Sequence, residues 1–170
     1  IAMKYFKNIL DANKKLKIIT VGSKGDDQIK RNFKNYIVEK ISYKNVKNIS
    51  LNEASELTSK IITMFENNEF DICTIFYNKF KSVISQEPQA QQIIPVENLD
   101  ADVESSEDED QYEFEPDENE ILEYLLPQNI TTQLYKAFLE NAASEQGSRM
   151  SAMDNATRNA GDLIDKLTIN

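Results

Sequence analysis

Few residues of this chain could perform chemistry, because its 170 residues include no histidine and only one cysteine. A histidine general base, a serine–histidine triad and a histidine-ligated metal site are therefore excluded. Cys73 has no histidine to activate it and lies inside an apolar run, so we expect a buried, inert thiol. Disulfide frameworks and cysteine-rich zinc sites are excluded by the same count. The composition predicts no catalytic residue.

One turn could bind phosphate. The residues Val21-Gly22-Ser23-Lys24-Gly25-Asp26 lie between a β-branched run and a helical pattern, a place where phosphates often bind. The dinucleotide fingerprint needs three glycines spaced G-x-G-x-x-G, and a P-loop ends in G-K-[ST], so neither motif is present. We therefore interpret the two glycines as framing a turn and expect no cofactor, although a nucleotide-binding enzyme remains the alternative function.

Acidic residues are concentrated in one window. No Lys or Arg occurs between Lys81 and Lys136, whereas 15 Asp and Glu residues do, so the rest of the chain carries a formal charge of +5 against a net charge of −10. The acidic loop at about 97–111 has little to bury and is predicted to be mobile. Asp100, Asp102 and Glu104 alternate as calcium ligands can, but the window lacks the glycine of an EF-hand loop. The sequence therefore predicts no metal site, and we expect no nucleic-acid partner.

The pattern before the acidic loop predicts a mixed α/β sheet. Apolar spacing indicates helices over 1–13, 26–36 and, from a Ser50–Glu53 capping box, to about Asn67. Strands are predicted at 16–21, within 37–43, at 71–78 with both faces covered, and at 80–85 and 91–96 on either side of a turn at Pro88. An edge strand at 112–115 and a short helix over 117–126 follow the loop. No stretch approaches the roughly 20 apolar residues that a membrane span needs.

The last 43 residues form one helical pattern that carries a coiled-coil seam. Written as heptads, the seam comprises Tyr135, Leu139, Ala142, Gln146, Arg149, Met153, Ala156, Ala160, Leu163 and Leu167. No other segment is long enough to pair with it, so the seam predicts a partner helix outside these residues. A helical adaptor is a second alternative function that the seam alone would allow. The predicted domains are a globular α/β foot over 1–127 and a coiled-coil helix over 128–170.

The run Ser144 to Thr168 (SEQGSRMSAMDNATRNAGDLIDKLT) closely resembles the C-terminal helix of the gamma subunits of rotary F-type ATP synthases. Two further segments agree: Phe76 to Gln86 (FYNKFKSVISQ) resembles that family's central strand pair, and Tyr112 to Asp117 (YEFEPD) its strand before the C-terminal helices. The resemblance is strongest to alphaproteobacterial and mitochondrial members. It implies a Rossmann-like globular domain with a long C-terminal helix that pairs in an antiparallel coiled coil with an N-terminal helix, and a truncation at both ends.

The resemblance also implies a function. The chain would be a non-catalytic rotor subunit of the central stalk, coupling rotation of the membrane c-ring to conformational changes at the catalytic alpha and beta subunits during ATP synthesis. Its implied partners are the alpha, beta and epsilon subunits and the c-ring, at the cytoplasmic face of the bacterial inner membrane. On this resemblance we expect shaft contacts from Met150, Met153, Asp154, Arg158, Asp162 and Lys166, and rotor-partner contacts from Tyr112, Phe114 and Glu115.

Overall fold

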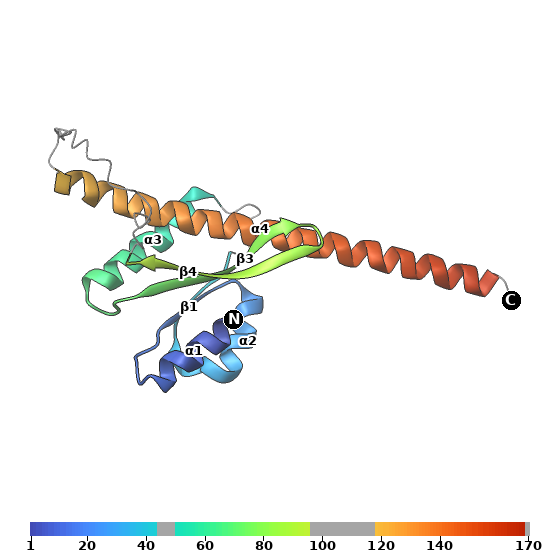
Figure 1. The fold of residues 1–170 in the computed structure, drawn as a ribbon, viewed down its shortest axis with the longest axis horizontal. Helices are drawn as coiled ribbons and strands as arrows, with labels where there is room; N and C mark the ends of the chain where they lie inside the picture. The colour runs from blue at the N-terminus through green and yellow to red at the C-terminus, as the bar shows by residue number, and fades with distance from the viewer. Residues whose placement is uncertain (44–49, 96–117, 169–170) are drawn as a thin grey trace, which may run out of the picture. The chain divides into compact units, whose positions relative to one another are not determined.

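The computed structural model describes residues 1–43, 50–95 and 118–168 (Figure 1). In chain order the elements are α1 (Ala2–Asp11), β1 (Ile18–Val21), α2 (Ser23–Phe33), the 3-10 helix η1 (Lys34–Tyr36), β2 (Ile37–Ile41), α3 (Leu51–Glu66), β3 (Cys73–Ser82), β4 (Ser85–Ile94) and α4 (Glu118–Thr168). They fall into two compact units. The first unit contains residues 1–75 and 90–135, and the second contains residues 76–89 and 136–170.

A β-α-β motif begins the first unit. Strands β1 and β2 pair in parallel, with Ile18 opposite Ile37 and Val21 opposite Ile41, and α2 makes the crossover that parallel neighbours require. Phe6 of α1 meets Phe33 of α2 edge to face, with ring centroids 5.5 Å apart, and both rings are buried. Figure 1 shows α1 and α2 lying together beside β1. These contacts make the N-terminal part of the unit a small two-layer α/β arrangement.

Helix α3 and the first part of α4 supply the rest of this unit's core. Ala54, Leu57 and Ile61 on α3, Ile93 on β4, and Leu134 on α4 are all buried. The buried Thr131 hydroxyl of α4 lies 2.9 Å from the Thr58 hydroxyl of α3, and the Gln91 side chain of β4 donates to the Gln133 side chain of α4 at 2.8 Å.

The predicted start of α3 is confirmed. The Ser50 N–H donates to the Glu53 carboxylate at 2.8 Å, and the Asn52 N–H donates to the Ser50 hydroxyl at 3.3 Å. This reciprocal capping box satisfies backbone donors that the first turn of a helix cannot pair internally. Local chemistry therefore places this boundary without help from the rest of the fold.

The predicted strand pattern around Pro88 is wrong. β3 runs on to Ser82, Val83 and Ile84 make the turn, and Pro88 lies inside β4 rather than between strands. A two-residue turn joins the strands into an antiparallel hairpin. Proline is tolerated here because the described part of this sheet has only two strands, which leaves an outer edge where no N–H is needed.

The expectation that the strand at 71–78 has both faces covered is also wrong. The first half of β3 is only half-buried and much of its second half is exposed, as is the neighbouring Ile72. The described strands form two separate two-stranded sheets, β1–β2 and β3–β4. The fold class is nevertheless confirmed as mixed α/β with a long C-terminal helix.

Helix α4 is a single 51-residue helix with Pro127 inside it, so the predicted break between 126 and 128 is wrong. A proline removes one backbone donor and strains one turn. The helix after it is held by buried Ile130 and Leu134, and extending an existing helix avoids the cost of a new nucleus. Among the described residues, no helix has the combination of length and apolar character that crossing a membrane requires.

Candidate functional site

The seam predicted on α4 is exposed in the second unit. Leu139, Ala142, Gln146 and Arg149 are exposed, and Met153 keeps 65% of its surface accessible. The continuation at Ala156, Ala160, Leu163 and Leu167 is exposed too. Within the described residues, this chain therefore provides no cover for the apolar stripe.

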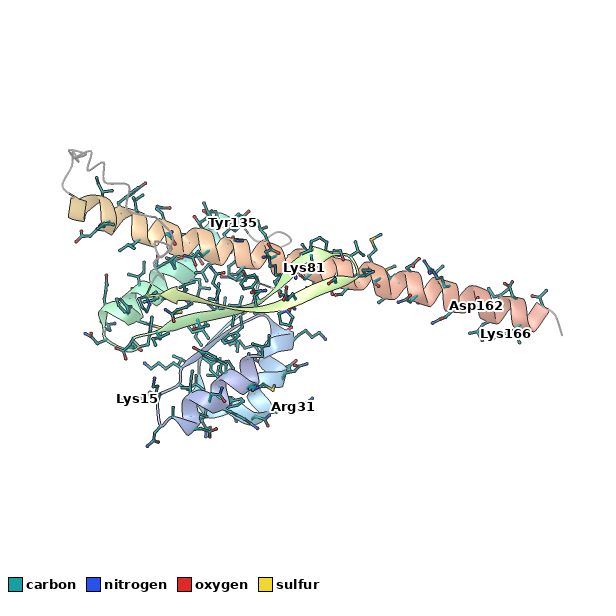
Figure 2. All side chains as sticks on the ribbon, viewed as in Figure 1. Lys15, Arg31, Lys81, Tyr135, Asp162 and Lys166 are labelled. Carbon is teal, nitrogen blue, oxygen red and sulfur yellow. The ribbon has the colours of Figure 1, made fainter. Side chains whose placement is uncertain are left out.

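The six predicted shaft residues lie on the same outer stretch of α4 and all are exposed. Arg158 donates to the Asp154 carboxylate at 2.9 Å across one helical turn, a solvent-exposed pair that contributes little to stability. Figure 2 shows the side chains of Asp162 and Lys166 near the C-terminal end of the helix. Met150 and Met153 add flexible apolar side chains to this polar stretch. The stretch offers contact groups of mixed character rather than a reactive centre.

The predicted rotor-partner residues Tyr112, Phe114 and Glu115 lie outside the described residues, as do the edge strand at 112–115 and the acidic loop at 97–111.

The opposite face of α4 is occupied by the β3–β4 hairpin. The Phe80 N–H donates to the Glu140 carboxylate at 2.7 Å, and the Ser144 hydroxyl, which is buried, donates to the Asn78 carbonyl at 3.0 Å. One turn further on, the Ser148 hydroxyl donates to the Gln86 side-chain oxygen at 3.0 Å. Three polar contacts thus join the helix to the hairpin at successive turns.

Gly147 lies within this contact. A Cβ on Gly147 would stand 3.0 Å from Cε2 of Phe80 and 3.4 Å from the backbone of Val83. The missing side chain lets the hairpin approach the helix backbone closely, which explains a helix-weakening residue in this position. Gly161, by contrast, has no atom of the described residues within 4 Å of the place that a Cβ would occupy.

The Gly22 turn is built as a structural junction. Gly22 has φ +95°, a conformation that glycine adopts without steric cost, and α2 begins at Ser23. Gly25 therefore lies inside α2, so the expectation that both glycines frame a turn and that the helix begins at Asp26 is wrong. Asp26, in the first turn of α2, is 3% exposed, accepts a hydrogen bond from Thr20 at 3.2 Å, and pairs with Lys40. The Lys40 ammonium holds the pKa of Asp26 below its usual value, and Asp26 in turn raises the pKa of Lys40. The acidic side chain of Asp26 places a negative charge in the first turn of α2, where a phosphate would bind, and this disfavours the nucleotide-binding alternative.

Cys73 is less buried than the sequence predicts, although its surroundings still disfavour a reactive thiol. It is half-buried at the start of β3, and burial raises the pKa of its thiol to about 11. A thiol with such a pKa is almost entirely protonated at neutral pH and is a poor nucleophile. Across residues 1–43, 50–95 and 118–168, no group of three or more acidic or cysteine side chains is placed to hold a metal ion.

Sequence reasoning missed the hairpin-facing residues of α4: Glu140, Ser144, Gly147 and Ser148. Taken one at a time, they read as part of a general polar surface, with the glycine as a weak point. Their spacing of three and four residues places them on one helical face, so their small size and helical period were a usable signal.

Comparison with known proteins identifies this architecture. The family model described as ATP synthase matches residues 2–170. The ATP synthase gamma chain of Pelagibacter ubique is 64% identical over 168 residues, covering 99% of this chain and 57% of that protein. The gamma chain of Allorhizobium ampelinum is 48% identical with the same coverage. This chain thus spans a little over half the length of these relatives.

Solved structures agree with the match to ATP synthase sequences. The central stalk and c-ring structure of the Tetrahymena thermophila mitochondrial ATP synthase aligns with a TM-score of 0.68 at 25% identity, covering 91% of this chain and 66% of that one. The rotor of the Euglena gracilis mitochondrial enzyme shares the fold, with a TM-score of 0.63 at 19% identity and coverage of 96% and 63%. With a match along almost its whole length, an α/β unit and a long helix that bears an exposed seam, the chain belongs to the ATP synthase family, and the two relatives named above are gamma chains.

Proposed function

We propose that this chain is the foot and part of the shaft of a gamma subunit, the central rotor of a proton-translocating F-type ATP synthase. The observation that carries the proposal is the exposed seam on α4, in a chain that matches gamma chains along 99% of its length. A partner helix would lie on the seam as an antiparallel coiled coil. The full-length relatives have room for it, since this chain spans 57% of the Pelagibacter protein.

The mechanism we propose is mechanical. A stiff, asymmetric shaft presents a different surface to each catalytic subunit, so each rotational position favours a different nucleotide-site conformation. Torque from the c-ring is thereby converted into differential binding free energy at the alpha and beta subunits. No group of this chain takes part in phosphoryl transfer, so the subunit is not itself an enzyme. The raised pKa of the Cys73 thiol and the acidic side chain of Asp26 in the first turn of α2 support this assignment.

The shaft contacts are assigned to Met150, Met153, Asp154, Arg158, Asp162 and Lys166. Their exposure on the outer stretch of α4 supports this role. Tyr112, Phe114 and Glu115 are assigned to the foot, in contact with the epsilon subunit and the c-ring. The whole subunit would lie peripherally at the cytoplasmic face of the bacterial inner membrane and bind no nucleic acid.

Site-specific photocrosslinking in the assembled ATP synthase tests the proposal. A benzoylphenylalanine at Met153 should crosslink to another helix of the same gamma subunit, identified by peptide mass spectrometry. The matched control is Asn155, which is exposed on the same turn but lies about 160° away around the helix at 100° per residue. If Met153 forms no crosslink to any other segment of the gamma subunit, the antiparallel shaft is refuted.

Rotation itself needs a separate measurement. A bead attached to the foot at an exposed lysine such as Lys15, replaced by cysteine in a Cys73→Ser background, should rotate when ATP is supplied to immobilised complexes. Figure 2 shows the Lys15 side chain in the first unit. Complexes that hydrolyse ATP while the bead stays still would contradict the rotor role. Saturable binding of labelled nucleotide to the isolated chain would instead favour the nucleotide-binding enzyme.

A further inference from the structure

The seam and the hairpin-facing residues lie on opposite sides of α4. At 100° per residue, Glu140, Ser144, Gly147 and Ser148 fall within about 100° of arc around the helix. The seam positions from Leu139 to Met153 centre about 180° from them on the same projection. The side of the helix that the hairpin holds therefore decides which way the seam points.

The contacts are of a kind that resists turning of the helix about its axis. The Ser144 and Ser148 hydroxyls each donate a hydrogen bond to an oxygen of the hairpin. The Glu140 carboxylate accepts a hydrogen bond from a backbone N–H of the hairpin. Turning α4 by even one residue position, about 100°, would move all three groups out of hydrogen-bond range. The donors and acceptors are spaced along three turns, so they also fix the position of the helix along its axis.

Gly147 adds a steric limit to the polar one. The closest approach at this glycine is to Phe80 and to the backbone of Val83, and backbone cannot move aside as a side-chain end can. Any other residue presented to the hairpin by a turned helix would bring a Cβ into this space. The helix and hairpin therefore fit together in one angular setting.

We propose that the β3–β4 hairpin is a clasp that sets the angular position of α4 and transmits torque between the foot and the shaft. Glu140, Ser144, Gly147 and Ser148 are its positioning residues. In the assembled rotor, α4 would be held between the clasp on one face and the partner helix on the other. This inference rests on the proposed rotor function and adds the device by which the seam is aimed.

The test uses full-length gamma subunits assembled into membrane-embedded ATP synthase. Gly147→Leu places a side chain in the clasp, and Gly161→Leu places the same side chain on the same helix where no atom of the described residues lies within 4 Å. For Gly147→Leu we expect ATP hydrolysis within about twofold of wild type. We expect ATP-driven proton pumping to be lower by at least about fivefold, because a displaced hairpin loses at least one hydrogen bond to the helix and one net hydrogen bond corresponds to about that factor. Gly161→Leu is the control for the distance measurement below, which reads the setting of the helix against the hairpin directly. Wild-type proton pumping by Gly147→Leu would overturn the clasp.

A distance measurement separates the clasp from general damage. Spin labels at Ile84, which is 85% exposed at the hairpin turn, and at Met150 on α4 report the setting directly in a Cys73→Ser background. We expect one narrow distance distribution for wild type and Gly161→Leu, and a broadened or shifted one for Gly147→Leu. An unchanged distribution in Gly147→Leu would overturn the proposal.

Milder variants cover the case in which Gly147→Leu does not assemble. Gly147→Ala should give the same distance change in smaller measure, and adding Phe80→Ala, which removes the nearest contact, should restore part of the wild-type distribution. Identical distributions for Gly147→Ala and wild type would overturn the clasp. If Met153 of the wild-type protein forms no crosslink to another helix of the gamma subunit, the proposed shaft is refuted. If Met153 still forms the wild-type crosslink in Gly147→Leu, only the clasp is overturned.

Discussion

The buried threonine pair between α3 and α4 allows a quantitative test of how the helix is anchored in the first unit. Thr58 is 2% exposed and Thr131 6% exposed, and their hydroxyl oxygens are 2.9 Å apart. The Thr58 hydroxyl donates to the Ala54 carbonyl at 2.9 Å. The single Thr131 hydroxyl hydrogen therefore makes the bond between the helices or turns to the Pro127 carbonyl at 2.8 Å.

This sharing predicts that the two positions are coupled. Thr131→Val removes the donor between the helices and leaves one lone pair of Thr58 unpaired, so it should lower the free energy of unfolding by about 1 kcal/mol. Thr58→Val should cost less, since the Thr131 hydroxyl can still donate to Pro127. In the double variant no buried hydroxyl is left unpaired, so its cost should be about that of Thr131→Val alone. The expected coupling energy is roughly 0.5 to 1 kcal/mol.

Urea unfolding followed by far-UV circular dichroism measures these free energies. Thr157→Val is the matched control, because this threonine makes the same bond to the carbonyl four residues earlier, at 2.9 Å, but is exposed on α4. Its effect should stay within about 0.5 kcal/mol. Single variants whose costs simply add in the double variant would refute the idea that one hydrogen is shared between the helices.

Three further outcomes follow from particular groups. Ser50→Ala should lower the free energy of unfolding by about 1 kcal/mol through loss of the α3 cap, and Ser50→Asp, which keeps an acceptor, should recover most of it in the same urea experiment. Because Lys40 lowers the pKa of Asp26 in the folded state, the stability from this pair should be complete above the ordinary carboxyl pKa and be lost as pH falls through the folded pKa. In Asp26→Asn this acid-dependent loss of stability should be absent. An acid unfolding profile identical to that of wild type would count against the pair. Cys73, with its thiol pKa raised to about 11, should react with a disulfide reagent at pH 7.5 far more slowly when folded than in urea, and equal rates would show that burial does not protect it.

The features decided by local sequence were predictable. The Ser50–Glu53 cap, the β-branched run of β1 and the apolar spacing of α1 each depend on residues within a few positions of one another. The seam on α4 was also readable, because helical periodicity alone fixes which residues share a face. The raised pKa of the Cys73 thiol agrees with the unreactive cysteine predicted from the missing histidine and the apolar run around it, whereas the expected full burial is not found.

The features that sequence reasoning gets wrong all depend on distant partners. Pro88 predicts a turn and Pro127 a helix break, since proline removes a backbone donor wherever it occurs. Whether that loss matters depends on what lies beside the strand and on whether neighbouring turns are anchored, as Ile130 anchors α4. Covered faces cannot be distinguished from half-covered ones in an apolar run, so β3 is less buried than its sequence predicts.

By itself the sequence determined that this chain has no histidine-based or disulfide chemistry, that it carries an α/β portion followed by a long helix, and that the helix bears a stripe suited to another helix. Only the tertiary structure decided the side from which that helix is held. The hairpin bonds to Glu140 and Ser144 join residues 60 and 66 positions apart, and Gly147 has meaning only beside Phe80. Periodicity orders residues around one helix, but the direction in which the helix faces is fixed by contacts that no local pattern encodes.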